Sequence, residues 1–308
     1  MNDRRNRKGK YNKKRQGSLS MFLVLIVLCC VGGIYFLIEK SHSTIPEPAL
    51  VTVDQDETGQ TQSEETEAET EMETETEALD ELTVSLTKMV SDYPEVQTIL
   101  DNRDEYPEEI LNMLASNGET LNFVLNYPEK KGTHCEVEIL NDFEYGTIPQ
   151  LFQWDERWGY QNYGSAVIAV TGCGPTALAM VAAGLTGDAS ITPAKVADYS
   201  EENNYYVMGQ GTSWTLMYEG CYEFGVAGIE LQLMESTIRD ELLMGHPIIC
   251  SMGPGDFTSD GHFIVLTDWT EEGIKINDPN SREKSEKLWS YETLEGQILN
   301  LWSYYAIY

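Results

Sequence analysis

An uncharged apolar run from Met21 to Ile38 limits how this chain of 308 residues can fold more than any other feature. Its length suffices for one membrane-spanning helix with little tilt. The preceding twenty residues hold eight Lys or Arg and one Asp. By the positive-inside rule we expect residues 1–20 in the cytoplasm, residues 21–38 across the cell membrane as a single pass, and the rest outside. A cleaved signal peptide is the alternative, but no A-x-A-like site follows the run.

Residues 39–78 form a low-complexity segment that is rich in Glu and Thr. It has almost nothing apolar to bury and its charges repel one another, which predicts an extended, disordered stalk. The whole chain carries a net charge of -31, and because the first twenty residues contribute +7, the remainder carries -38. A polypeptide with so large a negative charge binds nucleic acid poorly, and we expect no nucleic acid to bind.

Apolar residues at helical spacing return after the stalk, in groups that begin at Leu79, Ile110 and Leu121. The tripeptide YPE occurs three times in this region, and proline suits a first helical turn. The unequal spacing of these tripeptides argues against a solenoid repeat. We therefore expect a small helical neck over residues 79–132, packed on or near the main domain.

The main domain is expected over residues 148–308, with helical patterns first and strand patterns last. The predicted helices cover residues 175–183, 193–200, 214–224 and 236–244, and several of them end at a glycine. The predicted strands cover residues 247–252, 262–269, 274–277 and 302–308. This order favours an α+β fold over a doubly wound parallel sheet.

The stretch TGCGPTALAMV places Cys173 between two glycines and directly before a predicted helix. The unpaired amides and the positive dipole end of a helix favour the thiolate form of a cysteine. Gly172 and Gly174 would allow a sharp turn and the close approach of a substrate backbone. Taken alone, the motif fits a buried core thiol equally well.

A nucleophilic thiolate needs a base, and the chain has four histidines. His262 follows a glycine-rich loop and opens an apolar strand, a position that would hold the imidazole rigidly beside a cleft. The next strand ends at Asp278, so a hairpin would bring the carboxylate towards the imidazole, whose N–H it could accept. If the two strands pair regularly, His262 and Asp278 are offset from each other by a few residues. A bulge or a longer loop is therefore required to bring them together.

Each of these residues has a structural interpretation when it is taken singly. His262 would be a satisfied histidine at the domain edge, and Asp278 before a proline would form a turn. The combination of Cys173, His262 and Asp278 in this order favours a cysteine hydrolase instead.

Other site motifs are missing from the sequence. Walker, GxGxxG, HExxH, GxSxG and paired CxxC motifs do not occur, so we expect no cofactor and no metal. Of the cysteines beyond the apolar run, Cys135, Cys221 and Cys250 remain beside Cys173. If Cys173 is a free nucleophile, at most one disulfide can form among those three.

The stretches GCGPTALAMV, GHFIVLT and NDPNS resemble the papain-like cysteine peptidases related to bacteriocin-leader-processing (double-glycine) peptidases. The stretch IPQLFQWDERWGYQNYG is similar to the opening signature of their extracellular stand-alone branch. The resemblance extends from Ile148 to Tyr308. It implies a papain-like fold, in which a helical part carries the cysteine at a helix N-terminus and an antiparallel sheet carries the histidine and the aspartate.

The resemblance also implies a role for each residue of the three core motifs. Cys173 attacks a carbonyl carbon, His262 acts as base and then as acid, and Asp278 orients His262. Asn277 is a weaker candidate for the orienting role, since many papain-like enzymes use an amide there.

An oxyanion hole is implied as well, formed by a glutamine side chain and the backbone N–H of the cysteine. Leader-processing members carry this glutamine shortly before the cysteine, where this chain has Val167. Gln153, in the context FQWD, is our prediction for the oxyanion residue, ahead of Gln150 and Gln161.

From these observations we expect a membrane-anchored, extracellular cysteine peptidase-like hydrolase that cleaves a peptide or amide bond through a thioester acyl-enzyme. A peptide or a cell-wall peptide would be its substrate. One alternative is a non-catalytic peptide- or cell-wall-binding module, and another is an acyl transferase or transpeptidase that uses the same site. Leader-processing relatives are cytoplasmic domains fused to an exporter, so leader removal does not follow for a stalked extracellular domain.

Overall fold

The computed structural model describes residues 81–134, 136–144 and 146–307. All of these belong to one structural unit, Glu65–Tyr308. The predicted cytoplasmic head, membrane helix and stalk lie outside the described residues. Within the described part of the chain, no helix is both long and apolar enough to cross a membrane.

The neck consists of short helices whose apolar faces share one core. These are residues 81–89, α3 (Val96–Asp101), α4 (Glu108–Ser116) and α5 (Leu121–Lys130), with 3₁₀ turns η1 (Arg103–Glu105) and η2 (Gly118–Thr120). The predicted groups that begin at Ile110 and Leu121 fall on α4 and α5. The group that begins at Leu79 continues onto 81–89, and Leu79 itself lies outside the described residues. Spacing does not predict α3, because six residues give less than two turns of pattern.

The neck packs on the main domain through this core, which also contains Tyr160, Val167 and Ala169. The Tyr160 ring stacks on Phe123 of α5 with ring centroids 4.1 Å apart. The Tyr160 hydroxyl donates a hydrogen bond of 2.9 Å to the Phe123 carbonyl oxygen. A buried aromatic pair with its polar end satisfied fixes the neck on the domain firmly.

The three YPE prolines do not share one position. Pro107 directly precedes α4, and Pro94 lies two residues before α3 begins. Pro128 lies inside α5, so the expectation of a first-turn proline is wrong there. The proline removes one amide donor near the end of α5, and that helix is held by its buried residues, among them Phe123 and Tyr127.

Helix α7 (Cys173–Thr186) lies at the centre of the helical half of the main domain, and its residues from Gly174 to Gly184 are buried. The sequence predicts a helix that ends at Gly184, but α7 continues to Thr186 and ends at Gly187, whose φ is 73°. A Cβ at Gly184 would lie 2.7 Å from the Thr147 carbonyl oxygen. Gly184 therefore allows close packing inside the helix and is not its cap.

Helices α6 (Ile168–Thr171), α8 (Pro193–Glu202) and α9 (Thr215–Tyr218) belong to the same half as α7. Helix α10 (Glu235–Leu243) packs on the opposite face of the C-terminal sheet, where Ile238 and Leu242 share a core with Ile264. The prediction of one helix over 214–224 is wrong, because α9 ends at Tyr218 and a 3₁₀ helix, η3 (Gly220–Phe224), follows. A Cβ at Gly220 would lie 2.7 Å from Leu216 Cδ1, so the break accompanies tight local packing.

The C-terminal half forms an antiparallel sheet of order β5-β10-β6-β7-β8-β9. Its strands are β5 (Val226–Glu230), β6 (Ile248–Met252), β7 (His262–Trp269), β8 (Ile274–Asn277), β9 (Leu288–Trp289) and β10 (Ile298–Ala306). The short helices α11 (Arg282–Ser285) and α12 (Tyr291–Glu295) flank β9. Two small hairpins lie outside this sheet: β1 (Asn162–Tyr163) with β2 (Ala166–Val167), and β3 (Tyr206–Val207) with β4 (Gly211–Thr212).

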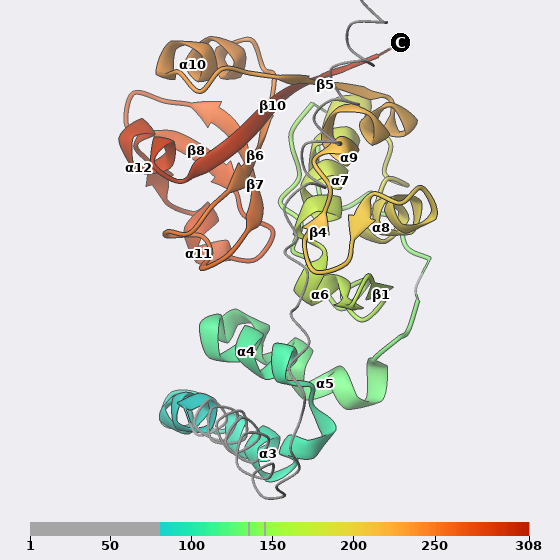
Figure 1. Ribbon diagram of the computed structural model, residues 1–308, viewed down its shortest axis with the longest axis vertical. Coiled ribbons are helices and arrows are strands. Elements are labelled where there is room, and N and C mark those ends of the chain that lie inside the picture. The colour runs from blue at the N-terminus through green and yellow to red at the C-terminus, as the bar shows by residue number, and fades with distance from the viewer. Residues whose placement is uncertain (1–80, 135, 145, 308) are drawn as a thin grey trace, which may run out of the picture. The chain divides into compact units, whose positions relative to one another are not determined.

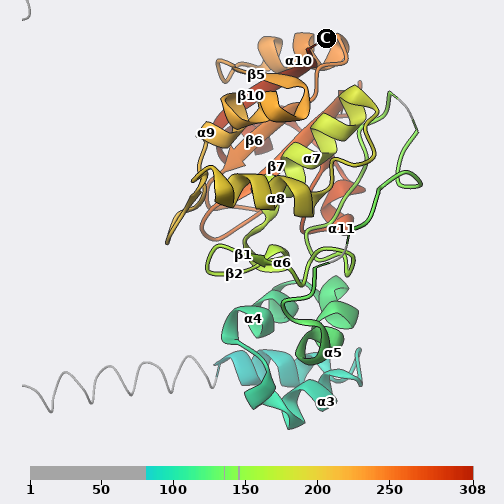
Figure 2. The same ribbon diagram turned by 90° about the vertical axis from the view of Figure 1, so that its right-hand side faces the viewer.

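The mixed α+β architecture agrees with the sequence, and β7 and β8 have the predicted bounds. The last strand begins at Ile298, earlier than the predicted 302, and β5 was not among the predicted strands. Side chains alternate across β7, so that Phe263 and Val265 join the core around α7. Ile264 joins the opposite core, which includes residues of α10 and α12. Figure 1 shows α7 on one side of the sheet, and Figure 2 shows the same arrangement turned by 90°.

Candidate active site

Cys173 is the first residue of α7 and is half-buried. Helix α6 leads into it, because the Gly172 N–H donates to the Ile168 carbonyl at 2.8 Å and the Gly172 carbonyl accepts from Thr176 at 3.0 Å. The amide groups of the first helical turn have no acceptor inside the helix. Cys173 therefore sits among free amide donors at the positive end of a long helix, where negative charge is stabilised.

Neither glycine beside Cys173 has room for a side chain. A Cβ at Gly174 would lie 2.7 Å from Thr212 Cβ in β4, and a Cβ at Gly172 would lie 2.5 Å from the Ile168 carbonyl oxygen. The space beside each glycine is filled by the protein itself. The expected approach of a substrate backbone is thus not what excludes side chains at these two positions.

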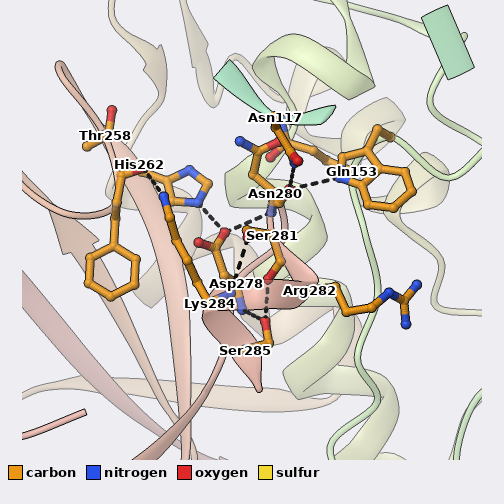
Figure 3. Close-up of polar contacts among 12 residues, drawn as sticks. Asn117, Gln153, Thr258, His262, Asp278, Asn280, Ser281, Arg282, Lys284 and Ser285 are labelled. Carbon is orange, nitrogen blue, oxygen red and sulfur yellow. Dashed lines mark hydrogen bonds and ion pairs between the residues drawn. The ribbon is translucent and has the colours of Figure 1, made fainter. Parts of the chain in front are cut away.

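His262 and Asp278 form a buried pair at one end of the β7–β8 hairpin. His262 Nε2 lies 2.7 Å from Asp278 Oδ1. Figure 3 shows this contact. His262 is 8% exposed and Asp278 is fully buried. A bulge in β7 shifts the register between Leu266 and Asp268. This bulge moves the residue opposite Asp278 from Val265 to Ile264 and so closes part of the offset that counting along the hairpin leaves.

The environment of His262 favours its protonated form. Burial lowers the pKa of His262, but the negative charge of Asp278, the hydrogen bond to Asp278 and the contact with Cys173 outweigh burial and raise the pKa to about 10. Because Asp278 occupies Nε2, Nδ1 is the ring atom left for the sulfur of Cys173. Cys173 at the start of α7, His262 at the start of β7 and Asp278 directly after β8 thus lie close together.

Asp278, and not Asn277, holds the imidazole. Asp278 Oδ1 also accepts a hydrogen bond of 2.8 Å from the Asn280 N–H, which fixes the carboxylate. The Asn277 side chain donates to the Pro149 carbonyl at 2.9 Å and so turns to another segment. The structure therefore does not place the weaker orienting candidate at His262.

Gln153 lies beside the helix that leads into Cys173. It is 4% exposed, and its Nε2 donates to the Ala169 carbonyl of α6 at 2.6 Å. Its backbone N–H donates to the Pro279 carbonyl at 2.8 Å, directly after Asp278. The Ala169 carbonyl fixes the orientation of the Gln153 amide, because a flipped amide would place Oε1 against the carbonyl oxygen. Gln153 Nε2 also donates to the Val170 carbonyl at 3.4 Å.

The two alternative glutamines are engaged elsewhere. Gln150 Nε2 donates to the Asp278 backbone carbonyl at 3.0 Å. Gln161 bridges His134 and Asp198 with its side-chain amide. Of the three glutamine side chains, only that of Gln153 hydrogen-bonds to α6, the helix before Cys173.

Residues 145–307, which are more than half of the chain, match the model of the Peptidase_C39 like family. The chain belongs to this family. Its membership supports a cysteine peptidase-type hydrolase and a peptide as the class of substrate. No curated protein matches the chain significantly.

Two solved structures resemble the C39-like chain at low identity. One is the peptidase domain of ComA from Streptococcus, a bifunctional ABC transporter of a quorum sensing pathway, with 22% identity and a TM-score of 0.35, covering 45% of this chain and 93% of that domain. The other is a proposed C39-like peptidase from Bacillus anthracis, with 17% identity and a TM-score of 0.30, covering 54% of this chain and 96% of the other.

The other described cysteines of this C39-like chain are buried. Cys221 and Cys250 are free thiols with no exposed surface, and burial raises the pKa of Cys221 to about 11 and that of Cys250 further still. The site therefore has one accessible sulfur among Cys173, Cys221 and Cys250. Cys135, the remaining cysteine of the predicted extracellular part, lies outside the described residues.

The remaining histidines and the acidic residues form no competing site. His246 Nδ1 contacts Glu241 Oε2 at 2.9 Å, and His134 contacts Gln161, while His42 lies outside the described residues. Among the residues that the structure describes, no three His, Cys, Asp or Glu side chains are grouped so that they could hold a metal ion.

Tyr163 is a neighbour of the cysteine that sequence reasoning missed. Its buried hydroxyl lies 2.8 Å from Ser200 Oγ and 2.9 Å from Thr212 Oγ1. The pKa of Tyr163 is raised to about 12, chiefly by burial. The hydrogen bonds with Ser200 and Thr212 oppose this rise in pKa, and the charge of Cys173 adds to it. Tyr163 falls within the quoted opening signature, but its partners lie 37 and 49 residues away, so no local pattern indicates the contact.

Proposed function

We propose that the C39-like domain hydrolyses a peptide bond with Cys173 as nucleophile, His262 as acid and base, and Asp278 as the residue that orients His262. The observation that carries this proposal is the buried His262–Asp278 pair, 2.7 Å between Nε2 and Oδ1, whose imidazole also contacts Cys173 at a helix N-terminus. A thiolate, an imidazolium and a fixed carboxylate in this order are the parts that acyl transfer requires.

In the first half of the reaction, the thiolate of Cys173 attacks the carbonyl carbon of the substrate. The charge moves to the carbonyl oxygen, where the Cys173 N–H and the side-chain amide of Gln153 are our candidates for the oxyanion donors. The C–N bond then breaks, the imidazolium of His262 gives its Nδ1 proton to the leaving amine, and a thioester remains on Cys173.

In the second half, neutral His262 takes a proton from water, and the resulting hydroxide attacks the thioester. The C–S bond breaks, the carboxylic acid product leaves and Cys173 returns to its starting form. Asp278 holds the ring throughout, because its Oδ1 occupies Nε2 and keeps Nδ1 towards the sulfur.

Selective alkylation tests whether Cys173 is the reactive thiol. We expect a limiting amount of iodoacetamide to modify Cys173 at least about tenfold faster than Cys221 or Cys250, since those thiols are buried and protonated. Mass spectrometry of the peptides after a time course gives each rate separately. Protein unfolded in guanidinium chloride should lose the selectivity. Equal rates in the native protein would rule out a special reactivity of Cys173.

We further propose that residues 21–38 anchor the enzyme in the cell membrane and that the peptidase domain lies outside. The support is the uncharged apolar run after a basic head. Protease added to intact cells should remove an epitope at the C-terminus and spare one at the N-terminus, and deletion of residues 21–38 should release the protein from the membrane fraction. A mature chain that starts after Ile38 in the medium would instead establish a cleaved signal peptide.

A further inference from the structure

The orientation of the Asp278 carboxylate depends on one of its two oxygens. Oδ1 contacts His262 Nε2 at 2.7 Å and accepts the Asn280 N–H at 2.8 Å. Oδ2 is buried and accepts no hydrogen bond from the described residues. A displacement of Asn280 would therefore allow the carboxylate to turn away from His262.

The neck holds Asn280 from the other side. The Asn117 side chain donates to the Asn280 carbonyl, and Trp154 Nε1 donates to the same oxygen at 2.9 Å. The Asn117 amide is itself oriented, because its Oδ1 accepts the Glu119 N–H at 3.0 Å. Figure 3 shows Asn280 between Asp278 and Asn117. One residue thus separates the neck from the carboxylate that faces His262.

Glu119 attaches the neck to the same segment a second time. Its Oε2 accepts the Arg282 N–H at 2.8 Å and its Oε1 accepts the Glu283 N–H at 3.0 Å. Hydrogen bonds to an ionised carboxylate are stronger than those between neutral groups. Two neck residues, Asn117 and Glu119, therefore fix residues 280–283, although 163 residues of sequence separate Asn117 from Asn280.

The peptidase domain holds the backbone nearer to Asp278. The Asp278 N–H donates to Ser285 Oγ at 2.9 Å, and the Pro279 carbonyl accepts the Gln153 N–H at 2.8 Å. At Asn280 the domain contributes the Trp154 indole, and the neck contributes the rest. The neck lies before residues 145–307, which match the family, so part of the support of Asp278 comes from outside the matched region.

We infer that Asn117 and Glu119 are positioning residues of the peptidase, and that the neck is needed for full activity and is not only a spacer. They act through Asn280 on Asp278, and through Asp278 on His262. The inference rests on the proposed function, because the residue that they position is the proposed orienting residue of the site. A small displacement of a group that aligns an acid–base residue is costly for the rate.

Two substitutions of Glu119 test this inference in the full chain of 308 residues. Glu119→Ala removes both hydrogen bonds to the backbone N–H groups of residues 282 and 283. Glu119→Gln keeps the size of the side chain and one oxygen acceptor, and its NH₂ group faces the other N–H. The glutamine variant should therefore lose one of the two hydrogen bonds.

Glu156→Ala is the matched control. Glu156 is half-buried like Glu119, and its carboxylate also joins the neck to the peptidase domain. It accepts from the Asn126 side chain at 3.1 Å and from Lys130 Nζ. Both partners lie on α5, so this variant loosens the neck without removing a hydrogen bond of the segment after Asp278.

The first measurement is the pH dependence of kcat and KM on a peptide library. We expect Glu119→Ala to lower kcat by about tenfold or more and to leave KM within about twofold, because Glu119 positions the site and does not bind the substrate. Asp278 and Cys173 are the titratable groups that interact with His262. A carboxylate that turns away raises the pKa of His262 less, so the alkaline limb should move from near pH 10 to lower pH.

The second measurement needs no substrate. Iodoacetamide should alkylate Cys173 more slowly at neutral pH in Glu119→Ala than in the wild type, because a weaker imidazolium stabilises the thiolate less. Glu119→Gln should change in the same direction by a smaller factor in both measurements. Glu156→Ala should keep the kcat, the alkaline limb and the alkylation rate of the wild type. Thermal unfolding of each variant reports whether it is folded.

The outcomes separate this inference from the proposed function. An active wild type together with a folded Glu119→Ala that keeps its kcat and its alkaline limb would overturn the positioning role alone. Equal losses in Glu119→Ala and Glu156→Ala would overturn it as well, since they would reflect attachment of the neck in general. If Glu119→Ala does not fold, the same criteria apply to Glu119→Gln. A wild type that hydrolyses no peptide would overturn the proposed function and this inference with it.

Discussion

Cys173→Ala should reduce peptide hydrolysis by at least about 10⁴-fold, because the substitution removes the atom that forms the thioester, and no neighbouring group replaces a missing nucleophile. The half-buried position of Cys173 at the start of α7 means that the loss of the sulfur leaves the core of the helix in place. The change should therefore affect kcat and leave the unfolding temperature close to that of the wild type. Hydrolysis of the peptide library and thermal unfolding are the two measurements.

Cys221→Ala provides the matched control, since Cys221 is a free but fully buried thiol. This variant should lose some stability through the cavity it creates and keep its kcat. Turnover by Cys173→Ala at the wild-type rate would refute the nucleophile. Mass analysis of the products with an added amine distinguishes hydrolysis from transfer, because only a transferase incorporates the amine.

Asp278→Asn should lower kcat/KM by about 10²- to 10⁴-fold. The carboxylate accepts the Nε2 proton of His262 at 2.7 Å and supplies the charge that raises the pKa of His262 to about 10. An amide supplies no charge, so burial would dominate and the pKa of His262 would fall. Since the leaving amine needs the imidazolium, the alkaline limb of the kcat/KM profile should move from near pH 10 to lower pH.

The shift of the pH profile separates an effect on His262 from a general loss of structure. Asp268→Asn is the control, because Asp268 lies on the same hairpin and is paired with Lys275 at 2.8 Å near the surface. That variant should keep both the rate and the alkaline limb of the wild type. An Asp278→Asn profile that is lower in rate but unmoved along the pH axis would contradict the orienting role of Asp278.

Local patterns in the sequence predict those parts of the fold that depend on near neighbours. Strands β7 and β8 have the bounds that alternation and the turn at Gly273 indicate. Counting along this hairpin requires an irregularity, and the bulge between Leu266 and Asp268 supplies one residue of the required shift. The positions of His262 and Asp278 follow from these local features, and their catalytic roles stay predictions.

Contacts between distant segments could not be predicted in this way. Asn280 joins the neck and the pair through Asn117, 163 residues away, and Gln153 contacts both Ala169 and Pro279. Gly184 looks like a helix cap in sequence, but it is required by the close approach of Thr147. A glycine that caps a helix and a glycine that allows close packing look the same in a sequence. Only the packing partner distinguishes the two.

The burial of α7 has a consequence for how such an enzyme can diversify. Every residue from Gly174 to Gly184 is enclosed, and a methyl group at either end would collide with Thr212 or Thr147. The helix that carries the sulfur therefore has no room for larger side chains at Gly174 and Gly184. New substrate preferences in such an enzyme would have to come from residues outside this helix.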